Sequence, residues 1–404
     1  MAISKTTYDL SIFLLLLLTI SSSPFLISAT NSSTTTYNVL SFGAKPDGLT
    51  DSTEGFLSAW AAACASESVA VICVPRGRFL LRSLAFKGEC RSPKIGFKID
   101  GTLVAPADYR VLRENDKWIS FEGVSHVSVV GGRLDARGAA LWACKLAAAG
   151  GANCPGGATT LSFTNSKDIK IIGLMSLNSQ MFHIVINACS NVQIQGVKVI
   201  ADGNSPNTDG IHVQLSTNVV IKGSTVKTGD DCISVGPGTK NLWIEHVACG
   251  PGHGISIGSL GGELVEAGVQ NVTVKNASFT GTQNGLRIKA WAKPSSGFVK
   301  GVQFEDVTMR NVQNPIIIDQ NYCPHNIDCP SQVSGIKISD VVYQGIRGTS
   351  ATPVAIKFDC SAANPCTGIK LQDVNLNCLN QAAESSCTNV NGKAFGIVQP
   401  NGCL

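Results

Sequence analysis

Short alternations of apolar and polar residues recur along most of the chain. One kind begins with a small or polar residue and continues apolar–polar–apolar, with copies starting at residues 126, 168, 191, 218, 241, 271, 301, 335 and 368. After the first copy, successive copies are 23 to 34 residues apart. A period of two residues is that of a β-strand with one face turned toward a core.

A second alternation lies between the copies of the first, with copies starting at residues 183, 210, 232, 254, 285, 315 and 353. Two or more strands therefore recur every 23–34 residues, with Gly and Asn turns and no helical period between them. Leucine-rich repeats share this period but would be richer in Leu, and a β-propeller needs four strands in blades of about 40 residues. The pattern predicts an all-β chain folded as a single right-handed parallel β-helix.

A solenoid of this kind has to cover both open ends of its core. Asp51 followed three residues later by Glu54 is typical of a helix start, with Asp51 as the N-cap. The Ala-rich residues 56–65 predict an amphipathic helix that caps the N-terminal end. We expect the Cys-rich residues 360–403 to close the other end.

The first 29 residues have the parts of a secretory signal peptide. Lys5 precedes an apolar run over residues 10–20, and small residues lead to an exit near Ala29. The run is short for a membrane anchor, which needs about 18–20 apolar residues. We therefore expect residues 1–29 to be removed and residues 30–404 to form one secreted β-helix domain with no membrane partner.

The composition narrows the class of protein. Only 15% of the 404 residues are charged, 41 are Gly, and the net charge is +4. A typical soluble domain is about 25% charged, so hydroxyl and amide groups must supply much of this surface. The apolar fraction of 44% excludes intrinsic disorder, and the glycines lack the three-residue period of collagen. The mild positive charge is compatible with an anionic partner, and nothing in the sequence predicts a nucleic-acid partner.

The 15 cysteines fit an oxidising compartment, where most should be paired. Because the count is odd, at least one stays free if the protein is a monomer, as we expect. The sequence has no CxxC pair of the metal-binding kind, and we predict neither a metal nor a cofactor. The disulfide candidates are the close pairs Cys323/Cys329 and Cys360/Cys366, together with Cys232, Cys249, Cys387 and Cys403. Three sequons make Asn31, Asn271 and Asn276 candidates for glycosylation.

Residues of chemical interest precede three consecutive copies of the second alternation. When the copies are aligned on their first apolar residue, Asp209, Asp231 and His253 each stand two positions earlier. Stacked coils lie about 4.8 Å apart, so we expect one column of these residues, with Asp230 beside Asp231. Neighbouring residues of a strand face opposite sides, so a bend at residues 229–232 must turn both carboxylates to the same cleft.

Carboxylates packed at this spacing cannot all ionise, and at least one pKa should rise. A protonated and an ionised carboxyl are the acid and base of glycoside hydrolysis. On the next coil, Arg287 and Lys289 flank Ile288 and should point outward, where their charge suits a substrate that carries carboxylates. A structural ladder of turn residues would explain any one Asp, but it would not place two cations beside the acids.

Four segments occur in a characteristic order: Asn207-Thr208-Asp209, Gly229-Asp230-Asp231, Gly252-His253-Gly254 and Arg287-Ile288-Lys289. They resemble the signatures of glycoside hydrolase family 28, the polygalacturonases, and the resemblance covers nearly the whole mature chain. It implies inverting hydrolysis of the α-1,4 bonds of polygalacturonate, the de-esterified pectin of the cell wall. It also implies these roles: Asp230 as general acid, Asp209 and Asp231 as activators of water, His253 as support for the acid, and Asn207, Arg287 and Lys289 as substrate-binding residues.

Finer resemblance favours exo action, which releases galacturonate from the chain end. Residues 205–210, 314–320 and 346–350 resemble plant exopolygalacturonases of the pollen type, although the last phrase also occurs in endo-acting relatives. Endo action is therefore the first alternative. Two further alternatives remain: a pectate lyase that uses Ca²⁺, and a non-catalytic solenoid that binds the cell wall.

Overall fold

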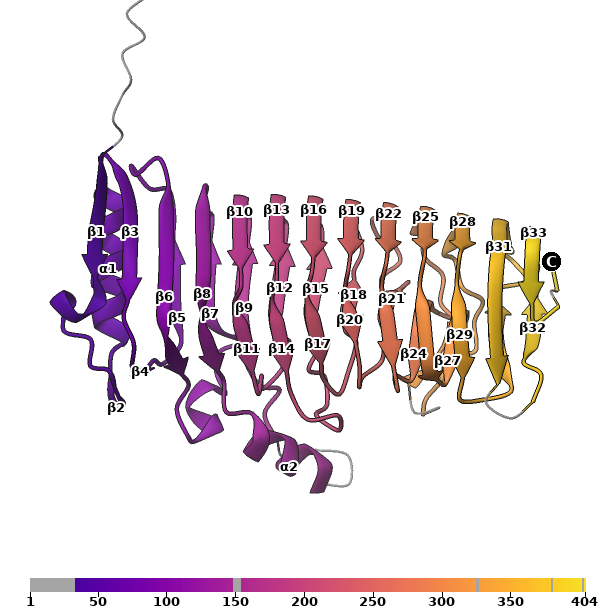
Figure 1. Cartoon of the computed structure of the whole chain (residues 1–404), viewed down its shortest axis with the longest axis horizontal. Coiled ribbons are helices and arrows are strands. Elements are labelled where there is room, and N and C mark those ends of the chain that lie inside the picture. Colours follow the sequence, from indigo (N-terminus) through magenta and orange to yellow (C-terminus); the bar gives the residue numbers. More distant parts are fainter. Residues whose placement is uncertain (1–32, 148–153, 325–326, 379–380, 402) are drawn as a thin grey trace, which may run out of the picture. The chain divides into compact units, whose positions relative to one another are not determined.

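The central coils of the protein each consist of three parallel strands, and successive coils stack side by side in Figure 1. The computed structural model describes residues 33–147, 154–324, 327–378, 381–401 and 403–404. Residues Thr34–Leu404 form one compact unit. The predicted signal peptide, residues 1–29, and the sequon residue Asn31 lie outside the described residues. Among the described residues, neither of the two α-helices has the length and apolarity that a membrane span requires.

The first sequence alternation forms one column of strands: β10 (Lys167–Ile172), β13 (Ser190–Gln195), β16 (Thr217–Lys222), β19 (Lys240–Glu245), β22 (Val269–Lys275), β25 (Phe298–Glu305) and β28 (Lys337–Gln344). The predicted copy at residue 335 is wrong, because Val302 of β25 pairs with Val341 of β28, so the stacked copy begins at Asp340. Short strands continue each coil after a turn: β11 (Met175–Leu177), β14 (Lys198–Ile200), β17 (Thr225–Lys227), β20 (Ala248–Cys249), β23 (Ser278–Thr280), β26 (Thr308–Val312) and β29 (Arg347–Ser350). These strands belong to one 22-stranded sheet.

The second alternation forms the second sheet, which has 11 strands. Its central members are β12 (Ile184–Asn187), β15 (Ile211–Gln214), β18 (Ile233–Val235), β21 (Ile255–Leu260), β24 (Asn284–Trp291), β27 (Asn314–Tyr322) and β30 (Val354–Asp359). All pairs between them are parallel. The chain is therefore a right-handed parallel β-helix, and the fold prediction is confirmed.

Alternation keeps one side of every strand inside the solenoid. Val219 and Ile221 of β16 are fully buried, whereas Lys222 is exposed. The register pairs Val219 with Val192 on one neighbour and with Leu242 on the other, so like residues stack along the core. Burial of each aliphatic side chain stabilises the folded state by about 1.5–3 kcal/mol. A slip of one residue would turn these side chains outward, so the repeated stack fixes the register of the strands.

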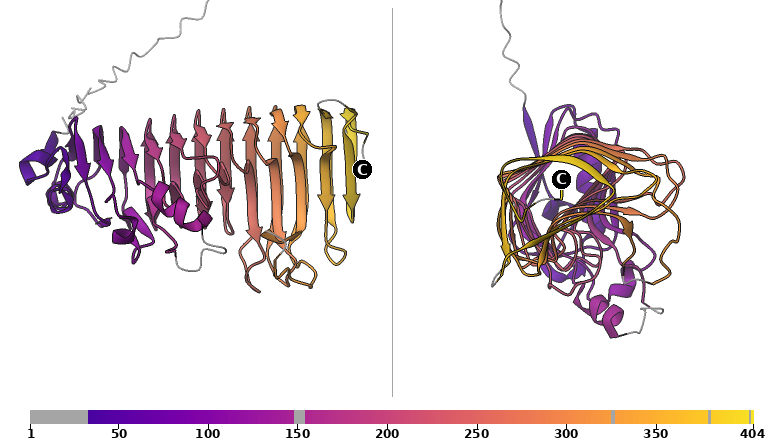
Figure 2. Two further views of the ribbon diagram at one scale, coloured as in Figure 1. Left: turned by 90° about the horizontal axis from the view of Figure 1, so that it is seen from below. Right: turned by 90° about the vertical axis from the view of Figure 1, so that its right-hand side faces the viewer.

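The N-terminal end begins with the remaining strands of the first coils: β1 (Thr34–Asn38), β2 (Asp47–Asp51), β3 (Val69–Val74), β4 (Arg78–Leu80), β5 (Leu84–Lys87), β6 (Ile95–Val104), β7 (Lys117–Glu122), β8 (Val127–Asp135) and β9 (Thr159–Thr164). Helix α1 (Thr53–Ala65) lies at this end, as Figures 1 and 2 show. Its Trp60 stacks on Phe97 at 5.8 Å between ring centroids, so the helix covers the core as expected.

The predicted N-cap of this helix is wrong by one residue. Ser52 is the N-cap, and the helix begins at Thr53. Asp51 instead accepts hydrogen bonds from the backbone N–H of Thr53 at 3.0 Å and from its hydroxyl at 2.6 Å. The Asp51 carboxylate thus accepts from a backbone N–H in the first turn of the helix, although Asp51 lies one residue before the N-cap.

The C-terminal end is formed by β31 (Cys366–Cys378), β32 (Glu384–Thr388) and β33 (Val390–Gln399), which continue both sheets. Six disulfides join Cys64–Cys90, Cys144–Cys154, Cys232–Cys249, Cys323–Cys329, Cys360–Cys366 and Cys387–Cys403. The sequence candidates are all among these pairs. Cys73, Cys189 and Cys378 are free, and only Cys189 is fully buried.

Candidate active site

The candidate site lies on the outer face of the second sheet. Ile211, Ile233 and Ile255 stack in register and point into the core. The residues that follow them in β15, β18 and β21 therefore face outward in a row, which continues to Arg287 in β24. Alternation along each strand is what turns these polar side chains away from the core.

The loops that carry the acids stack with the same spacing as the strands. The N–H of Gly210 donates to the carbonyl of Asp231 at 2.9 Å, and the N–H of His253 donates to the carbonyl of Asp230 at 2.7 Å. Strand β18 begins only at Ile233, so the bend expected at residues 229–232 is present. Backbone hydrogen bonds between successive loops thus bring Asp209, Asp230, Asp231 and His253 to one region.

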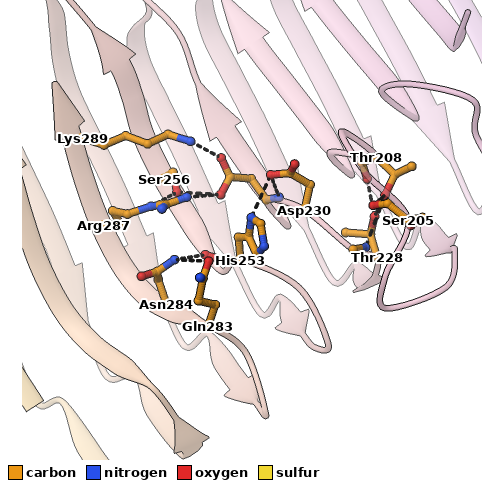
Figure 3. A network of polar contacts seen from close by, with 12 residues as sticks. Ser205, Thr208, Thr228, Asp230, His253, Ser256, Gln283, Asn284, Arg287 and Lys289 are labelled. Carbon is orange, nitrogen blue, oxygen red and sulfur yellow. Dashed lines mark hydrogen bonds and ion pairs between the residues drawn. The ribbon is translucent and has the colours of Figure 1, made fainter. Parts of the chain in front are cut away.

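A buried group of three hydroxyls ties two of these loops together, as Figure 3 shows. The Thr208 hydroxyl lies 2.7 Å from that of Ser205 and 2.5 Å from that of Thr228. Thr228 also donates to the backbone carbonyl of Thr208. Because Thr208 precedes Asp209 and Thr228 lies two residues before Asp230, this cluster fixes the relative position of the two acids.

Asp231 is held as a carboxylate by two cations. Lys289 donates to its Oδ2 at 2.8 Å, and Arg287 donates to its Oδ1 at 2.7 Å. The Ser256 hydroxyl adds a bond to Oδ1 at 2.8 Å. Burial opposes ionisation, but Lys289, Arg287 and Ser256 together outweigh it and hold the pKa of Asp231 below its usual value.

Asp230 faces the cleft and contacts His253. Its Oδ1 accepts a hydrogen bond from the backbone N–H of Asp231 at 2.8 Å and lies 3.1 Å from Nδ1 of His253. Oδ1 is thus occupied by two partners, and Oδ2 is left as the oxygen that can carry a proton. Figure 3 shows the imidazole of His253 below this carboxyl group.

The environment of Asp209 disfavours the ionised carboxylate, whereas that of Asp231 favours it. Burial raises its pKa well above the usual value, and the nearby carboxylates Asp230 and Asp231 raise it further. Ser234 and Lys289 oppose this rise but do not cancel it. The pKa values of two neighbouring carboxyl groups are therefore shifted in opposite directions, and a rise of at least one is what the sequence spacing predicts.

Two adjoining cavities give a substrate access to these groups. One of about 500 Å³ is lined by His253, Arg287 and Asp319, and one of about 290 Å³ is lined by Asp209 and Asp231. Residues Asn207, Asp230, Lys289 and Tyr322 line both. Asp230 therefore lies where the two halves of one cleft meet.

Three side chains of the site have donor atoms close enough together to be considered as metal ligands. Ligand atoms of Asp230, Asp231 and His253 lie within 4.8 Å of one another. Both oxygens of Asp231, however, already bind the side chains of Arg287 and Lys289. A divalent cation would have to displace or repel these two cations, so the donor set does not favour a metal.

Two neighbours of the site were missed by sequence reasoning. Ser256 stands between two inward Ile residues, so the alternation could have revealed its outward direction. Tyr322 places its ring 5.2 Å from the ammonium of Lys289 and 5.9 Å from the guanidinium of Arg287. Tyr322 lies near Lys289 because the pairing of β24 with β27 shifts register between Lys289 and Trp291. No sequence pattern predicts this shift.

Comparison with known proteins supports the assignment of the family. The model of glycosyl hydrolases family 28 matches residues 64–397. A polygalacturonase of Prunus persica is 62% identical over 94% of this chain and 96% of its own length. An exopolygalacturonase of Platanus acerifolia is 43% identical over 89% of this chain and 95% of its own.

Solved structures share the fold at low sequence identity. The endo-xylogalacturonan hydrolase of Aspergillus tubingensis has a TM-score of 0.77 with 23% identity, over 90% of this chain and 100% of that one. The exopolygalacturonase of Thermotoga maritima has a TM-score of 0.71 with 18% identity, over 89% and 91%. Together with the sequence matches, this confirms the resemblance that the four signature segments indicated: the chain belongs to glycosyl hydrolases family 28.

Proposed function

We propose that this protein is a polygalacturonase that hydrolyses the α-1,4 bonds of de-esterified pectin by acid–base catalysis with inversion. The observation that carries the proposal is the division among three neighbouring acids. Two cations hold the pKa of Asp231 below its usual value, burial raises the pKa of Asp209, and Asp230 lines the cleft beside His253. Environments that separate the pKa values of adjacent carboxyl groups are what an acid–base pair needs.

Asp230 is the proposed general acid. With Oδ1 occupied by His253 and the Asp231 amide, a proton on Oδ2 would face the cleft and pass to the leaving glycosidic oxygen. Asp231 and Asp209 are the proposed activators of water, which attacks the anomeric carbon and gives its proton to this pair. Asp209 has to lose its own proton before it can accept one, so activity should fall at low pH.

Arg287 and Lys289 are the proposed binders of a galacturonate carboxylate. Arg287 uses its Nε for Ser256 and its Nη2 for Asp231, which leaves Nη1 for a ligand. Lys289 has three N–H donors, and Asp231 takes one of them. Both side chains line the larger cavity together with Asn207. Because methyl esterification removes the charge that these cations would bind, the de-esterified polymer is the preferred substrate.

Exo action is the favoured mode, and endo action is the alternative. The relatives from Platanus acerifolia and Arabidopsis thaliana that carry the name exopolygalacturonase support it, at 43% and 41% identity. The six disulfides and residues 1–29 support a secreted protein that acts in the cell wall, and a monomer is proposed.

Chromatography of the early products from polygalacturonate tests exo action against endo action. Free galacturonate as the first product supports exo action, whereas a mixture of oligomers would show endo action. Activity that persists with a chelator, without products that absorb in the ultraviolet, separates the hydrolase from a Ca²⁺-dependent lyase. If the wild-type protein releases no reducing ends, the hydrolase proposal is wrong, and a non-catalytic binding solenoid remains.

A further inference from the structure

The outer face of the second sheet changes character one coil beyond the two cations of the site. Strand β27 pairs with β24 so that Ile317 lies beside Arg287 and Asp319 lies beside Lys289. Alternation along β27 turns Ile317 and Asp319 outward, as alternation along β24 does for the cations. Two adjacent coils therefore present different chemistry to the cleft: a pair of cations on one, and an apolar side chain with an acid on the next.

These four side chains line one cavity. They belong to the cavity of about 500 Å³, which meets the smaller one at Asp230. A polymer that crosses the acids through both cavities has to run along the solenoid, from coil to coil. Adjacent strands are about 4.8 Å apart. When one sugar unit is bound by the cations, the next unit on the side of β27 lies against Ile317 and Asp319.

Asp319 has no cation of its own. Its Oδ1 accepts a hydrogen bond from the backbone N–H of Asn321 at 2.9 Å. Among the described residues no ion pair includes Asp319, because the two cations of the site bind Asp231 and Lys357 binds Asp359 at 3.7 Å. The Asp319 carboxyl thus lines a cleft for an anionic polymer without a charge that compensates it.

A second negative charge beside Asp319 is therefore unfavourable. Burial raises the pKa of Asp319, and the nearby charge of Asp359 adds to the rise, whereas Lys357 and Arg287 oppose it. A free carboxylate of the substrate would bring another like charge to this place. A methyl ester carries no charge, and its methyl group can pack against Ile317, whose side chain is apolar and only 8% exposed.

We propose that Asp319 and Ile317 form a subsite that selects a methyl-esterified galacturonate unit, next to the free galacturonate that Arg287 and Lys289 bind. This inference rests on the proposed function and refines it, because it confines the requirement for a free carboxylate to the unit bound by the cations. Asp319 is a specificity-determining residue and takes no part in the acid–base steps. Its Oδ2, which has no partner among the described residues, accepts a hydrogen bond from a sugar hydroxyl.

The test compares four trigalacturonates at pH 7: one without esters, and three with a single methyl ester on the first, second or third unit. In the wild type, one of the esterified trimers should have a higher kcat/KM than the unesterified trimer. The trimer with its ester on the unit bound by the cations should have a lower one. Asp319→Asn should raise kcat/KM on the unesterified trimer by roughly 3- to 10-fold and abolish the advantage of the ester. The amide keeps an oxygen for the Asn321 N–H, so the strand end is preserved.

Two further variants separate this subsite from a general effect of charge. Asp359→Asn removes an acid from the same row one coil further along, outside the lining of the cavity, so it should keep the wild-type ratios between the four trimers. Ile317→Thr should lower kcat/KM on the favoured esterified trimer and leave the unesterified trimer unchanged, because only the ester presents a methyl group to this side chain.

Calorimetry of the four trimers on the Asp230→Asn protein measures the same preference without turnover. The favoured esterified trimer should bind more tightly than the unesterified one, and adding Asp319→Asn should remove the difference. The inference is overturned if every esterified trimer is the poorer substrate and ligand, if Asp319→Asn leaves the ratios unchanged, or if Asp359→Asn changes them equally. A wild type that hydrolyses the unesterified trimer with any of these results refutes the subsite alone. A wild type that hydrolyses neither the trimers nor polygalacturonate refutes the proposed function.

Discussion

Two columns of polar side chains run along the same solenoid with the same spacing between coils. They differ in whether the stacked polar groups bind or repel one another. On the first sheet, Asn191, Asn218, Asn241 and Asn271 form a ladder in which each side-chain Nδ2 donates to the Oδ1 of the residue one coil earlier, at 3.1 Å for the last three. All four have φ near +56° and are exposed. On the second sheet, the column holds Asp, Asp and His beside two cations.

The difference follows from the groups themselves. An amide is both donor and acceptor, so identical side chains satisfy one another over any number of coils. A carboxylate only accepts and repels its copies, so repeated acids are tolerated only when their environments differ. Asp231 binds two cations, which hold its pKa below the usual value, whereas Asp209 binds neither of them and burial raises its pKa. The ladder satisfies its own hydrogen bonds, and the acid column is the proposed source of reactivity.

The largest expected effect is on the reactive column. Asp230→Asn should lower kcat for polygalacturonate by roughly 10²–10⁴-fold, because the amide cannot protonate the leaving oxygen. The urea midpoint should stay close to that of the wild type, since His253 and the Asp231 amide keep an oxygen to bind. Assay of reducing ends measures the effect, and unchanged turnover would remove Asp230 from the mechanism.

The next effect is on stability. Arg287→Met should destabilise the protein by about 3–5 kcal/mol at neutral pH, because it leaves buried Asp231 with Lys289 as its only cation. A depressed pKa contributes stability that is present above the unfolded pKa and is lost as pH falls through the folded pKa. The difference from wild type in urea unfolding should therefore shrink below pH 4, and a difference that is constant with pH would contradict an ionised Asp231. Ser256→Ala is the matched control, with a loss of about 1 kcal/mol.

Asp209→Asn should separate activity from stability. The raised pKa of Asp209 means that the folded state binds its proton more tightly than the unfolded chain, so stability falls as pH rises above about 4. The amide variant should be more stable than wild type at neutral pH and equal to it in acid, as measured by urea unfolding at both pH values. Activity should fall. A variant that is less stable at neutral pH would show that Asp209 is ionised in the free enzyme.

The smallest effect is expected in the amide ladder. Asn241→Gly should cost about 1 kcal/mol, because it removes the bonds to Asn218 and Asn271 while glycine tolerates the positive φ of 55°. Asn241→Ala should cost about 1 kcal/mol more, since alanine is strained there. Both variants should keep wild-type kcat. Loss of activity in either would show that the two columns are not independent.

Much of the fold could be predicted from local patterns. Apolar residues two apart specify strands and their inward faces, and the spacing of the copies predicts most of their stacking, which places Arg287 and Lys289 outward beside the acids. The copy at residue 335 fails, because β28 pairs with β25 through Val341. The exact start of the first helix could not be predicted, because Asp51 and Ser52 are both good caps and the surrounding coil decides between them. Tyr322 could not be predicted either, since a register irregularity brings its ring to Lys289.

The sequence by itself determined the repeat, most of the register and the set of candidate site residues, because alternation and spacing act through the chain's own periodicity. Only the tertiary structure decided how charge and protons are distributed among them. Arg287 and Lys289 reach Asp231 across 56 and 58 residues, and burial among the other carboxyl groups raises the pKa of Asp209. A pKa depends on burial and on distances of a few ångströms, and these exist only once the coils are stacked.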